Sequence, residues 1–531
     1  MGGATGSETV PRLILAAIVV LALWSHLWGI RGDLPWAYAS DEGRFAVIAI
    51  RMATQGDPNP HWFGHPGSTL LYPLALLFHV GNALEAGLPL LQVDPGLAAR
   101  VGGNPGKYFL LGRLISVFYA VASLPLLYAV ASRTFDATTA VVATWLALLS
   151  PLALELAQMM RTDSAGVFFG LLALWLVLRV LDRPDRVAHA LAGLAIGAAI
   201  GTRYFLATLV PVLLCADVVL LARLRGRREE QRRLLGATVV GLVCVGVGFA
   251  LTTPYFVLHF DAVWANLGHE MREEHLGADG LGFAGNLVWY LTDALPASMP
   301  AVWLVAAAAG AALAAWRRNV AAVLVLLSIV TFLVAISTAS LHWQRWLVQI
   351  VPLLAAFAAS ALVALARALA ALLPSARRLE VALVVLLTVV VSAQPALAYF
   401  RFSAQQAIPS TRIVAREWIE ANLPPGSTIA ADLYTAPLHD TQLHADYHFS
   451  LAADGDLEDY RKAGYDYVMI SDAIYRRYLR ERRRYPREVA FYETLLKNGR
   501  LVKRFTPHEV GRGPTISLYA LRESPVPQDT R

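Results

Sequence analysis

The stretch from Tyr204 to Thr253, YFLATLVPVLLCADVVLLARLRGRREEQRRLLGATVVGLVCVGVGFALTT, contains two apolar runs joined by a strongly basic turn. The runs, 204–222 and 234–253, each have close to the roughly 20 residues that an α-helix needs to cross the hydrocarbon core of a membrane. The turn between them, 223–233, carries six arginines. A helical hairpin with such a turn is typical of a polytopic membrane protein whose basic loops face the cytoplasm.

The composition of the whole chain supports this interpretation. Of its 531 residues, 56% are hydrophobic and 16% are charged, whereas soluble domains carry about a quarter charged residues. The net charge of +6 is modest and unevenly placed along the chain, so a nucleic-acid partner is not predicted. The two cysteines, Cys215 and Cys244, lie in apolar runs, which indicates neither a disulfide framework nor a zinc site.

Apolar runs of suitable length predict about 11 transmembrane helices. They cover residues 13–30, 108–131, 138–157, 164–181, 187–202, 204–222, 234–253, 288–315, 319–338, 346–371 and 379–399. The first run lacks a cleavage site after it and is interpreted as a retained helix, not as a signal peptide.

Short basic turns predict the orientation of these helices. With this count, arginine pairs at 183 and 186, 317 and 318, and 377 and 378 fall on the same side as the basic turn 223–233. The positive-inside rule then places the N-terminus in the cytoplasm and everything after residue 400 outside, in a multi-pass protein of the plasma (inner) membrane.

One segment of the first outer loop, 31–107, is ambiguous. Residues 69–91 could form a twelfth span, but counting it would move every later basic turn to the other side of the membrane. We therefore predict helices that lie along the outer interface within this loop.

The residues after 399 differ in kind from those before. The stretch STRIVAREWIEANLPPG, 410–426, predicts an amphipathic helix, and STIAAD (427–432) and YDYVMIS (465–471) predict short buried strands. We predict a transmembrane domain over 1–399 and a small extracytoplasmic α/β domain over 400–531.

Ionisable residues interrupt the apolar pattern at the predicted outer turns, where charge near the membrane is costly and often functional. They include Asp41, Glu42, His65, Asp163, Arg203 and Arg345, together with His61, Arg161, Glu270 and His342. Arginine binds phosphate in a bidentate manner, and a carboxylate can accept a proton from an attacking hydroxyl. The set therefore suits a phosphate-bearing lipid whose tail stays in the bilayer.

Each of these residues also has a purely structural explanation. Asp41 and Glu42 could stabilise a helix N-terminus, and Asp163 could simply pair with Arg161. Arg203 and Arg345 could be interfacial arginines that extend toward water. These alternatives are left open by the residues alone.

The order of several motifs resembles the GT-C membrane glycosyltransferases, in particular the branch of the protein O-mannosyltransferases and the lipid A aminoarabinose transferases. The resemblance covers residues 13–371. Its motifs include DEGRFAVIAIRMATQGD (41–57), FGHPGSTLLYPLALLF (63–78), MRTDSAGVFFGLLAL (160–174) and RWLVQIVPLLAAFAA (345–359).

The resemblance implies an inverting transfer of a sugar from a polyprenyl-phosphate donor at the outer membrane face. Asp41 matches the family's acidic residue in the first outer loop, which is the candidate base. Glu42 matches a neighbouring acid of the mannosyltransferase branch, and Asp163 matches an acid after the third span. All three are predicted as catalytic residues.

The resemblance also implies a set of residues that bind the donor phosphate. Arg345 matches an arginine expected near the lipid phosphate, and Arg203 matches a Lys or Arg at the same turn. His65 matches a Lys or His before a Pro-Pro pair, although here Pro66 is followed by Gly67.

No metal is required for this reaction, because the leaving group carries one phosphate; Asp41, Glu42 and His65 are the residues that could hold a divalent ion. The acceptor could be an envelope lipid, a glycan or a protein. The alternative is a transporter or flippase of polyprenyl-linked lipids or sugars, which would require inverted repeats and broken helices at the membrane midplane.

Overall fold

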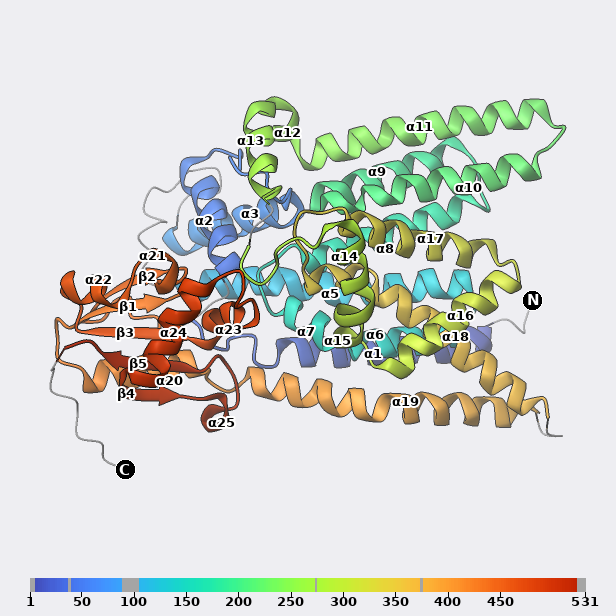
Figure 1. Cartoon of the computed structure of the whole chain (residues 1–531). Coiled ribbons are helices and arrows are strands. Elements are labelled where there is room, and N and C mark those ends of the chain that lie inside the picture. The colour runs from blue at the N-terminus through green and yellow to red at the C-terminus, as the bar shows by residue number, and fades with distance from the viewer. Residues whose placement is uncertain (1–4, 37–39, 88–104, 273–274, 373–375, 523–531) are drawn as a thin grey trace.

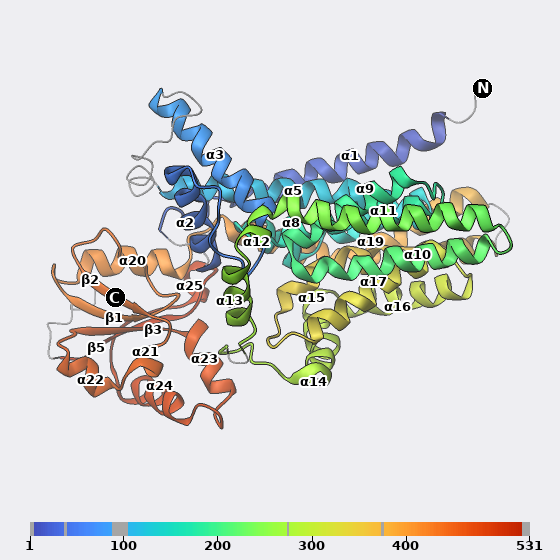
Figure 2. The same ribbon diagram turned by 90° about the horizontal axis from the view of Figure 1, so that it is seen from above.

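A bundle of apolar helices forms the larger part of the protein, and a five-stranded sheet domain lies at one end of it (Figure 1). The computed structural model describes residues 5–36, 40–87, 105–272, 275–372 and 376–522. The start of α1 and the turn between α10 and α11 lie at the end of the bundle away from the sheet domain (Figures 1 and 2).

Eight helices of the described ranges are long and apolar enough to cross a membrane, and two bent pairs raise this number to at most ten. The eight are α1 (Thr5–Leu27), α5 (Pro105–Thr134), α8 (Asp163–Val180), α10 (Leu209–Arg223) with the 3₁₀ turn η1 (Tyr204–Thr208), α11 (Arg228–Thr252), α17 (Val320–Ser337), α18 (Val351–Ala370) and α19 (Ala376–Gln406). The apolar helix α9 (Arg186–Thr202) is shorter. The multi-pass helical fold predicted from the sequence is confirmed.

Two predicted spans are bent in the structure, whereas the sequence predicts a single straight helix for each. The segment 138–157 consists of α6 (Ala137–Leu148) and α7 (Pro151–Ala157), which meet at 65°. The prediction of one continuous helix over 288–315 is wrong, because the helical segments Gly282–Ser298 and Ala301–Trp316 meet at 118°. Met299 precedes a proline and adopts an extended conformation, with φ −143° and ψ 143°, and this conformation ends the helix.

The other elements of the bundle are mostly short, apart from α16, which packs against α18. They are α12 (Pro254–Leu258), α13 (Phe260–Glu270), α14 (Gly282–Trp289), η2 (Tyr290–Ala294), α15 (Leu295–Ser298), α16 (Ala301–Trp316) and η3 (Gln344–Gln349).

Small residues allow α9 and α11 to pack closely. A Cβ atom on Gly193 would lie 2.1 Å from the carbonyl oxygen of Gly241, so any larger residue at position 193 would push the helices apart. Close approach at small residues is a common way to associate helices in a membrane, where apolar burial gives no driving force.

The first predicted outer loop contains two helices at the end of the bundle that faces the sheet domain (Figure 2). In α2 (Ser40–Gln55), Phe45, Ile48 and Met52 form a buried apolar face against α3 (Ser68–Ala86). The spacing of these residues follows the helical period. The ambiguous segment 69–91 thus begins within α3, which is not among the candidate spans, and residues 88–91 lie outside the described part. That α3 lies at the membrane interface stays a prediction.

The C-terminal part is the α/β domain that the sequence predicts. Its strands are β1 (Thr428–Asp432), β2 (His444–His448), β3 (Tyr467–Ser471), β4 (Arg500–Phe505) and β5 (Ile516–Ala520), and its helices are α20 (Thr411–Asn422), α21 (Leu451–Asp454), α22 (Leu457–Lys462), α23 (Asp472–Arg480), α24 (Pro486–Asn498) and α25 (Pro507–Val510).

The sheet has the order β2-β1-β3-β5-β4, in which β2, β1 and β3 are parallel and the other pairings are antiparallel. Alternate side chains of β1 enter two cores: Ile429 packs in the core that includes α20, and Ala430 in the core that includes α23 and α24. A strand with both faces buried explains why STIAAD and YDYVMIS are short, almost continuous apolar runs.

Two groups of contacts attach this domain to the bundle. Arg512 forms an ion pair of 2.7 Å with Asp33, and the guanidinium of Arg416 stacks 4.0 Å from the ring of Trp36. On the other side, Tyr485 donates a hydrogen bond of 3.1 Å to the buried Asp279. These contacts hold the domain over the end of the bundle where the ionisable residues gather.

Candidate active site

A cavity of about 1110 Å³ lies between the end of the bundle and the sheet domain. Its wall includes four of the predicted site residues together with residues of the C-terminal domain. The four are Asp41, His65, Arg203 and Arg345. Residues that are distant in the sequence therefore meet at one site.

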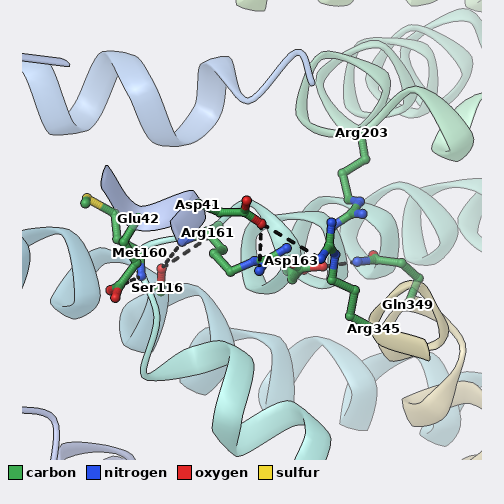
Figure 3. A network of polar contacts seen from close by, with 9 residues as sticks. All are labelled: Asp41, Glu42, Ser116, Met160, Arg161, Asp163, Arg203, Arg345 and Gln349. Carbon is green, nitrogen blue, oxygen red and sulfur yellow. Dashed lines mark hydrogen bonds and ion pairs between the residues drawn. The ribbon is translucent and has the colours of Figure 1, made fainter. Parts of the chain in front are cut away.

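Five charged residues at this site form one network (Figure 3). Arg161 bridges the two aspartates: its Nη1 lies 2.8 Å from Oδ2 of Asp41, and its Nε lies 3.0 Å from Oδ2 of Asp163. Arg203 pairs with the other oxygen of Asp163, and Nη1 of Arg345 lies 3.8 Å from Asp41. Three cations thus surround two carboxylates.

The two aspartates of the network differ in exposure. The side chain of Asp163 is 1% exposed and that of Asp41 is 41% exposed. Both oxygens of Asp163 are held by arginines, and its carbonyl oxygen accepts a hydrogen bond of 3.0 Å from Gln349. Asp163 therefore orients Arg161 and Arg203, and Asp41 is the carboxylate of this network that reaches the cavity.

A glycine makes room for this arrangement. A Cβ atom on Gly166 would lie 2.8 Å from Cδ of Arg203 and 2.9 Å from Nε2 of Gln349. Both side chains cross the helix α8 at Gly166, one turn after Asp163, so a larger residue at 166 would displace them.

The charges around Asp41 determine its ionisation. Burial raises the pKa of Asp41, but Arg161 and Arg345 lower it by more, so the pKa lies below its ordinary value of 3.8. Asp41 is therefore a carboxylate at neutral pH. A carboxylate in this state can accept a proton from a hydroxyl group within hydrogen-bond reach.

Glu42 does not reach the cavity, although the sequence predicts it as a catalytic residue beside Asp41. It is fully buried, and Arg113 binds it in a bidentate manner, with distances of 2.8 and 3.0 Å. Its Oε1 also accepts a hydrogen bond of 2.9 Å from the backbone N–H of Met160 (Figure 3). Successive residues of a helix point about 100° apart, so Asp41 and Glu42 face different surroundings. In this structure Glu42 fixes the N-terminus of α2.

Arg345 has a hydrogen-bond donor that the described part of the chain leaves unpaired. Its Nε is buried, and no hydrogen-bond partner for it occurs among the described residues; the same holds for Nε1 of Trp346. Trp343 supports the guanidinium of Arg345 from one side, at 4.3 Å from its ring. Burial lowers the pKa of Arg345 to about 10, so the side chain remains a cation at neutral pH. Unsatisfied buried donors beside a cavity favour an anionic ligand.

His65 lines the same cavity, with its ring 5.3 Å from that of Trp62. Burial, together with Arg203 and Arg345, lowers the pKa of His65 to about 3. The ring is therefore neutral between pH 5 and 8, and it can donate a hydrogen bond but adds no charge to the site.

This ionisation state gives a first prediction. Replacing His65 by asparagine should leave the shape of the pH profile between pH 5 and 8 unchanged, because the ring does not titrate in this range. Initial rates measured at half-unit steps in this range, for the wild type and the variant, test this. A limb near pH 6.5 that disappears in the variant would contradict the low pKa.

The three residues that could hold a divalent ion do not all reach the cavity. Asp41 and His65 line the cavity, whereas Glu42 is occupied by Arg113. Within the described ranges, no three or more His, Cys, Asp or Glu side chains are grouped so that they could hold a metal ion.

Comparisons with known proteins concern the fold of the chain. Residues 101–249, which include α5 to α10 and most of α11, match the family model described as dolichyl-phosphate-mannose-protein mannosyltransferase. The fold is similar to the archaeal oligosaccharyltransferase AglB from Archaeoglobus fulgidus, solved in complex with an inhibitory peptide and a dolichol-phosphate. That match has a TM-score of 0.53 and 13% identity, and covers 99% of this chain and 76% of that one. The chain therefore shares its fold with this oligosaccharyltransferase, and residues 101–249 match the mannosyltransferase model.

A second similar solved structure is that of ArnT from Cupriavidus metallidurans bound to undecaprenyl phosphate. It is 15% identical, with a TM-score of 0.49, and the match covers 98% of this chain and 99% of that one. A search of curated protein sequences finds no match. These comparisons give the fold, and the geometry above supplies the candidate site residues.

Several site residues are not in the set predicted from the sequence. Arg161 is among the predicted outer-turn residues, in MRTDSAG, but it is not predicted as a site residue. Its contact with Asp41 joins two residues that are 120 positions apart in the sequence. Arg113 and Gln349 lie in apolar segments, and an arginine in a predicted span is the one signal that could have marked Arg113. Residues of the C-terminal domain also line the cavity, and no feature of their sequence marks them as site residues.

Proposed function

We propose that this protein transfers a glycosyl group from a polyprenyl-phosphate donor to a hydroxyl group of an envelope lipid, glycan or protein, with inversion at the anomeric carbon. The observation that carries the proposal is the distance of 3.8 Å between the exposed carboxylate of Asp41 and Nη1 of Arg345, whose Nε is buried and unsatisfied by the described residues. A base and a phosphate-binding cation are thus within reach of one substrate.

In the proposed reaction, Asp41 accepts the proton of the acceptor hydroxyl. The acceptor oxygen forms a bond to the anomeric carbon, and the bond from that carbon to the phosphate oxygen breaks. The polyprenyl phosphate leaves with one more negative charge, which Arg345 and Arg203 stabilise. Asp163 acts as a positioning residue, because its carboxylate accepts a hydrogen bond from Arg203. Gln349 donates a hydrogen bond to the carbonyl oxygen of Asp163, and neither residue is among those that line the cavity.

The proposal includes the orientation and the division of the chain. The basic turn between α10 and α11 lies at the opposite end of the bundle from the cavity, which supports a cytoplasmic N-terminus and an extracytoplasmic cavity. We propose a catalytic transmembrane domain over 1–399 and an extracytoplasmic domain over 400–531. A transporter is less well supported, because the charged network lies at one end of the bundle and transporter sites lie near the midplane.

A second prediction tests the phosphate site. Replacing Arg345 by glutamine should raise the KM for the polyprenyl-phosphate donor by about 10- to 100-fold, since a hydrogen bond to a charged group contributes about 1.5–3 kcal/mol. Steady-state transfer in lipid nanodiscs, with undecaprenyl-phosphate hexose as the donor, gives this value. Arg345→Lys should recover part of the loss, because lysine keeps the charge but not the fork.

The matched control for this variant is Arg318→Gln, which changes an arginine at the opposite end of the bundle. An equal rise of the KM in both variants, or no rise in either, would contradict a phosphate site at Arg345. Absence of transfer from any polyprenyl-phosphate sugar by the wild-type protein would contradict the proposed function itself.

A further inference from the structure

The C-terminal domain turns the carboxyl ends of its parallel strands toward the cavity. Leu433 and Tyr434, which directly follow β1, line it, as does Phe449, which follows β2, and Arg477 on α23, the helix after β3. In open α/β sheets, ligands bind at the carboxyl ends of parallel strands, in the loops that follow them. The edge of the sheet that is suited to ligand binding is therefore part of the wall of the membrane cavity.

A row of rings connects this wall to the proposed phosphate site. The guanidinium of Arg345 lies over Trp343, the rings of Trp343 and His275 are 5.0 Å apart, and those of His275 and Phe449 are 6.0 Å apart. Phe449 is 44% exposed, so one side of its ring is accessible from the cavity that it lines. The rings extend from the donor side of the cavity to the sheet domain.

The turn that presents Tyr434 is held rigidly in a conformation that costs free energy. Tyr434 has φ of 64°, in the left-handed region that bulky residues avoid. Asp432, the last residue of β1 and two positions before Tyr434, anchors the start of this turn. Its carboxylate accepts hydrogen bonds from the backbone N–H of Leu451, at 2.8 Å, and from the hydroxyl of Tyr492, at 2.9 Å. Strain of this kind persists where the surrounding structure enforces it and is concentrated at binding sites.

The cavity as a whole has more positive than negative side chains. Among its described lining residues, six are arginines and three are carboxylates, and Arg477 is the arginine of this set that the C-terminal domain supplies. Arg477 lies 5.8 Å from the centre of the Tyr434 ring and donates a weak hydrogen bond, of 3.4 Å, to the carbonyl oxygen of Leu276. A guanidinium has five N–H donors, so Arg477 can also donate to a ligand.

We propose that Tyr434, Phe449 and Arg477 form the acceptor subsite, and that it binds an anionic glycan; this inference rests on the proposed function of the same cavity. Aromatic rings provide flat apolar faces for the C–H faces of sugar rings, and arginine binds a carboxylate or phosphate on the sugar. The acceptor hydroxyl then lies between this wall and Asp41.

A peptide acceptor fits these observations less well. An extended peptide is bound by adding a strand to the exposed edge of a sheet, where backbone groups supply the hydrogen bonds. The edge strands here are β2 and β4, and no residue of either lines the cavity in the described part of the chain. The lining residues of this domain follow the ends of β1 and β2 or lie on α23, and they present side chains to the cavity. Side chains without a free strand edge suit a sugar better than an extended peptide.

Binding of defined probes to the full-length protein in lipid nanodiscs tests this inference. The probes are a hexamer of galacturonic acid, maltohexaose as the neutral counterpart, and hexaglutamate as an acidic peptide. We expect the acidic hexasaccharide to bind at least about 10-fold more tightly than the neutral one, because one charge-assisted contact is worth roughly that factor. Arg477→Gln should remove this preference, and Phe449→Ala should weaken both glycans.

The matched control is Arg476→Gln, since Arg476 is exposed on the same helix, pairs with Asp472 at 3.2 Å and does not line the cavity. This control should bind like the wild type. Equal binding of the two glycans, no binding of either, or tighter binding of hexaglutamate would overturn the subsite. Binding of undecaprenyl phosphate is measured in parallel. If it binds and the glycans do not, the acceptor subsite is contradicted while the proposed donor stands. If only the glycans bind, the proposed polyprenyl-phosphate donor is contradicted while the subsite stands.

Discussion

The variant Asp41→Asn is expected to transfer glycosyl groups about 10²–10⁴-fold more slowly than the wild type, which is the usual contribution of a general base. Asparagine keeps the size of the side chain but cannot accept the proton of the acceptor hydroxyl. Arg161 remains paired with Asp163 in this variant, so the phosphate site should stay in place. Single-turnover transfer from undecaprenyl-phosphate hexose at a saturating donor concentration measures the loss.

The pH dependence distinguishes this role from a structural one. Because Arg161 and Arg345 hold the pKa of Asp41 below 3.8, protonation of this carboxylate should reduce the rate only below about pH 4. Asp41→Glu should restore part of the rate, and Asp261→Asn, an exposed aspartate on α13 outside the cavity wall, should have no effect. A rate for Asp41→Asn within a few-fold of the wild type would refute the base.

The sequence predicts the fold well because apolar length and basic turns are local signals. It fails at 288–315, where the residue before Pro300 breaks a helix inside an otherwise uniform apolar run. Such a break depends on the conformation of one residue, and the hydropathy of the run gives no sign of it.

The candidate site is predicted in part. The outer-turn pattern and the family resemblance identify Asp41, Arg203 and Arg345, and these do line one cavity. The pattern cannot separate Asp41 from Glu42, because adjacent acids at a helix start look alike until the neighbours of each are known. The deciding neighbour, Arg113, is 71 residues from Glu42.

A last prediction concerns this pair. Glu42→Ala should reduce the free energy of unfolding by about 3–5 kcal/mol, because it leaves the guanidinium of Arg113 buried without its counter-charge. Both side chains are at most 8% exposed, and Arg113 is further held by the carbonyl oxygens of Ile30 and Gly32, so it cannot turn toward water. Denaturant titration in mixed micelles measures the change, with Glu230→Ala, which breaks an exposed ion pair, as a control expected to lose at most about 1 kcal/mol.

The double variant Glu42→Leu with Arg113→Met separates stability from catalysis. It removes both charges and fills the space with apolar atoms, so it should regain most of the stability that Glu42→Ala loses. If Glu42 only fixes the N-terminus of α2, the folded fraction of the double variant should transfer glycosyl groups at a rate within about 10-fold of the wild type, because Asp41 keeps its place. A stable double variant whose rate falls as far as that of Asp41→Asn would show that the carboxylate of Glu42 takes part in the reaction and that its pairing with Arg113 changes during turnover.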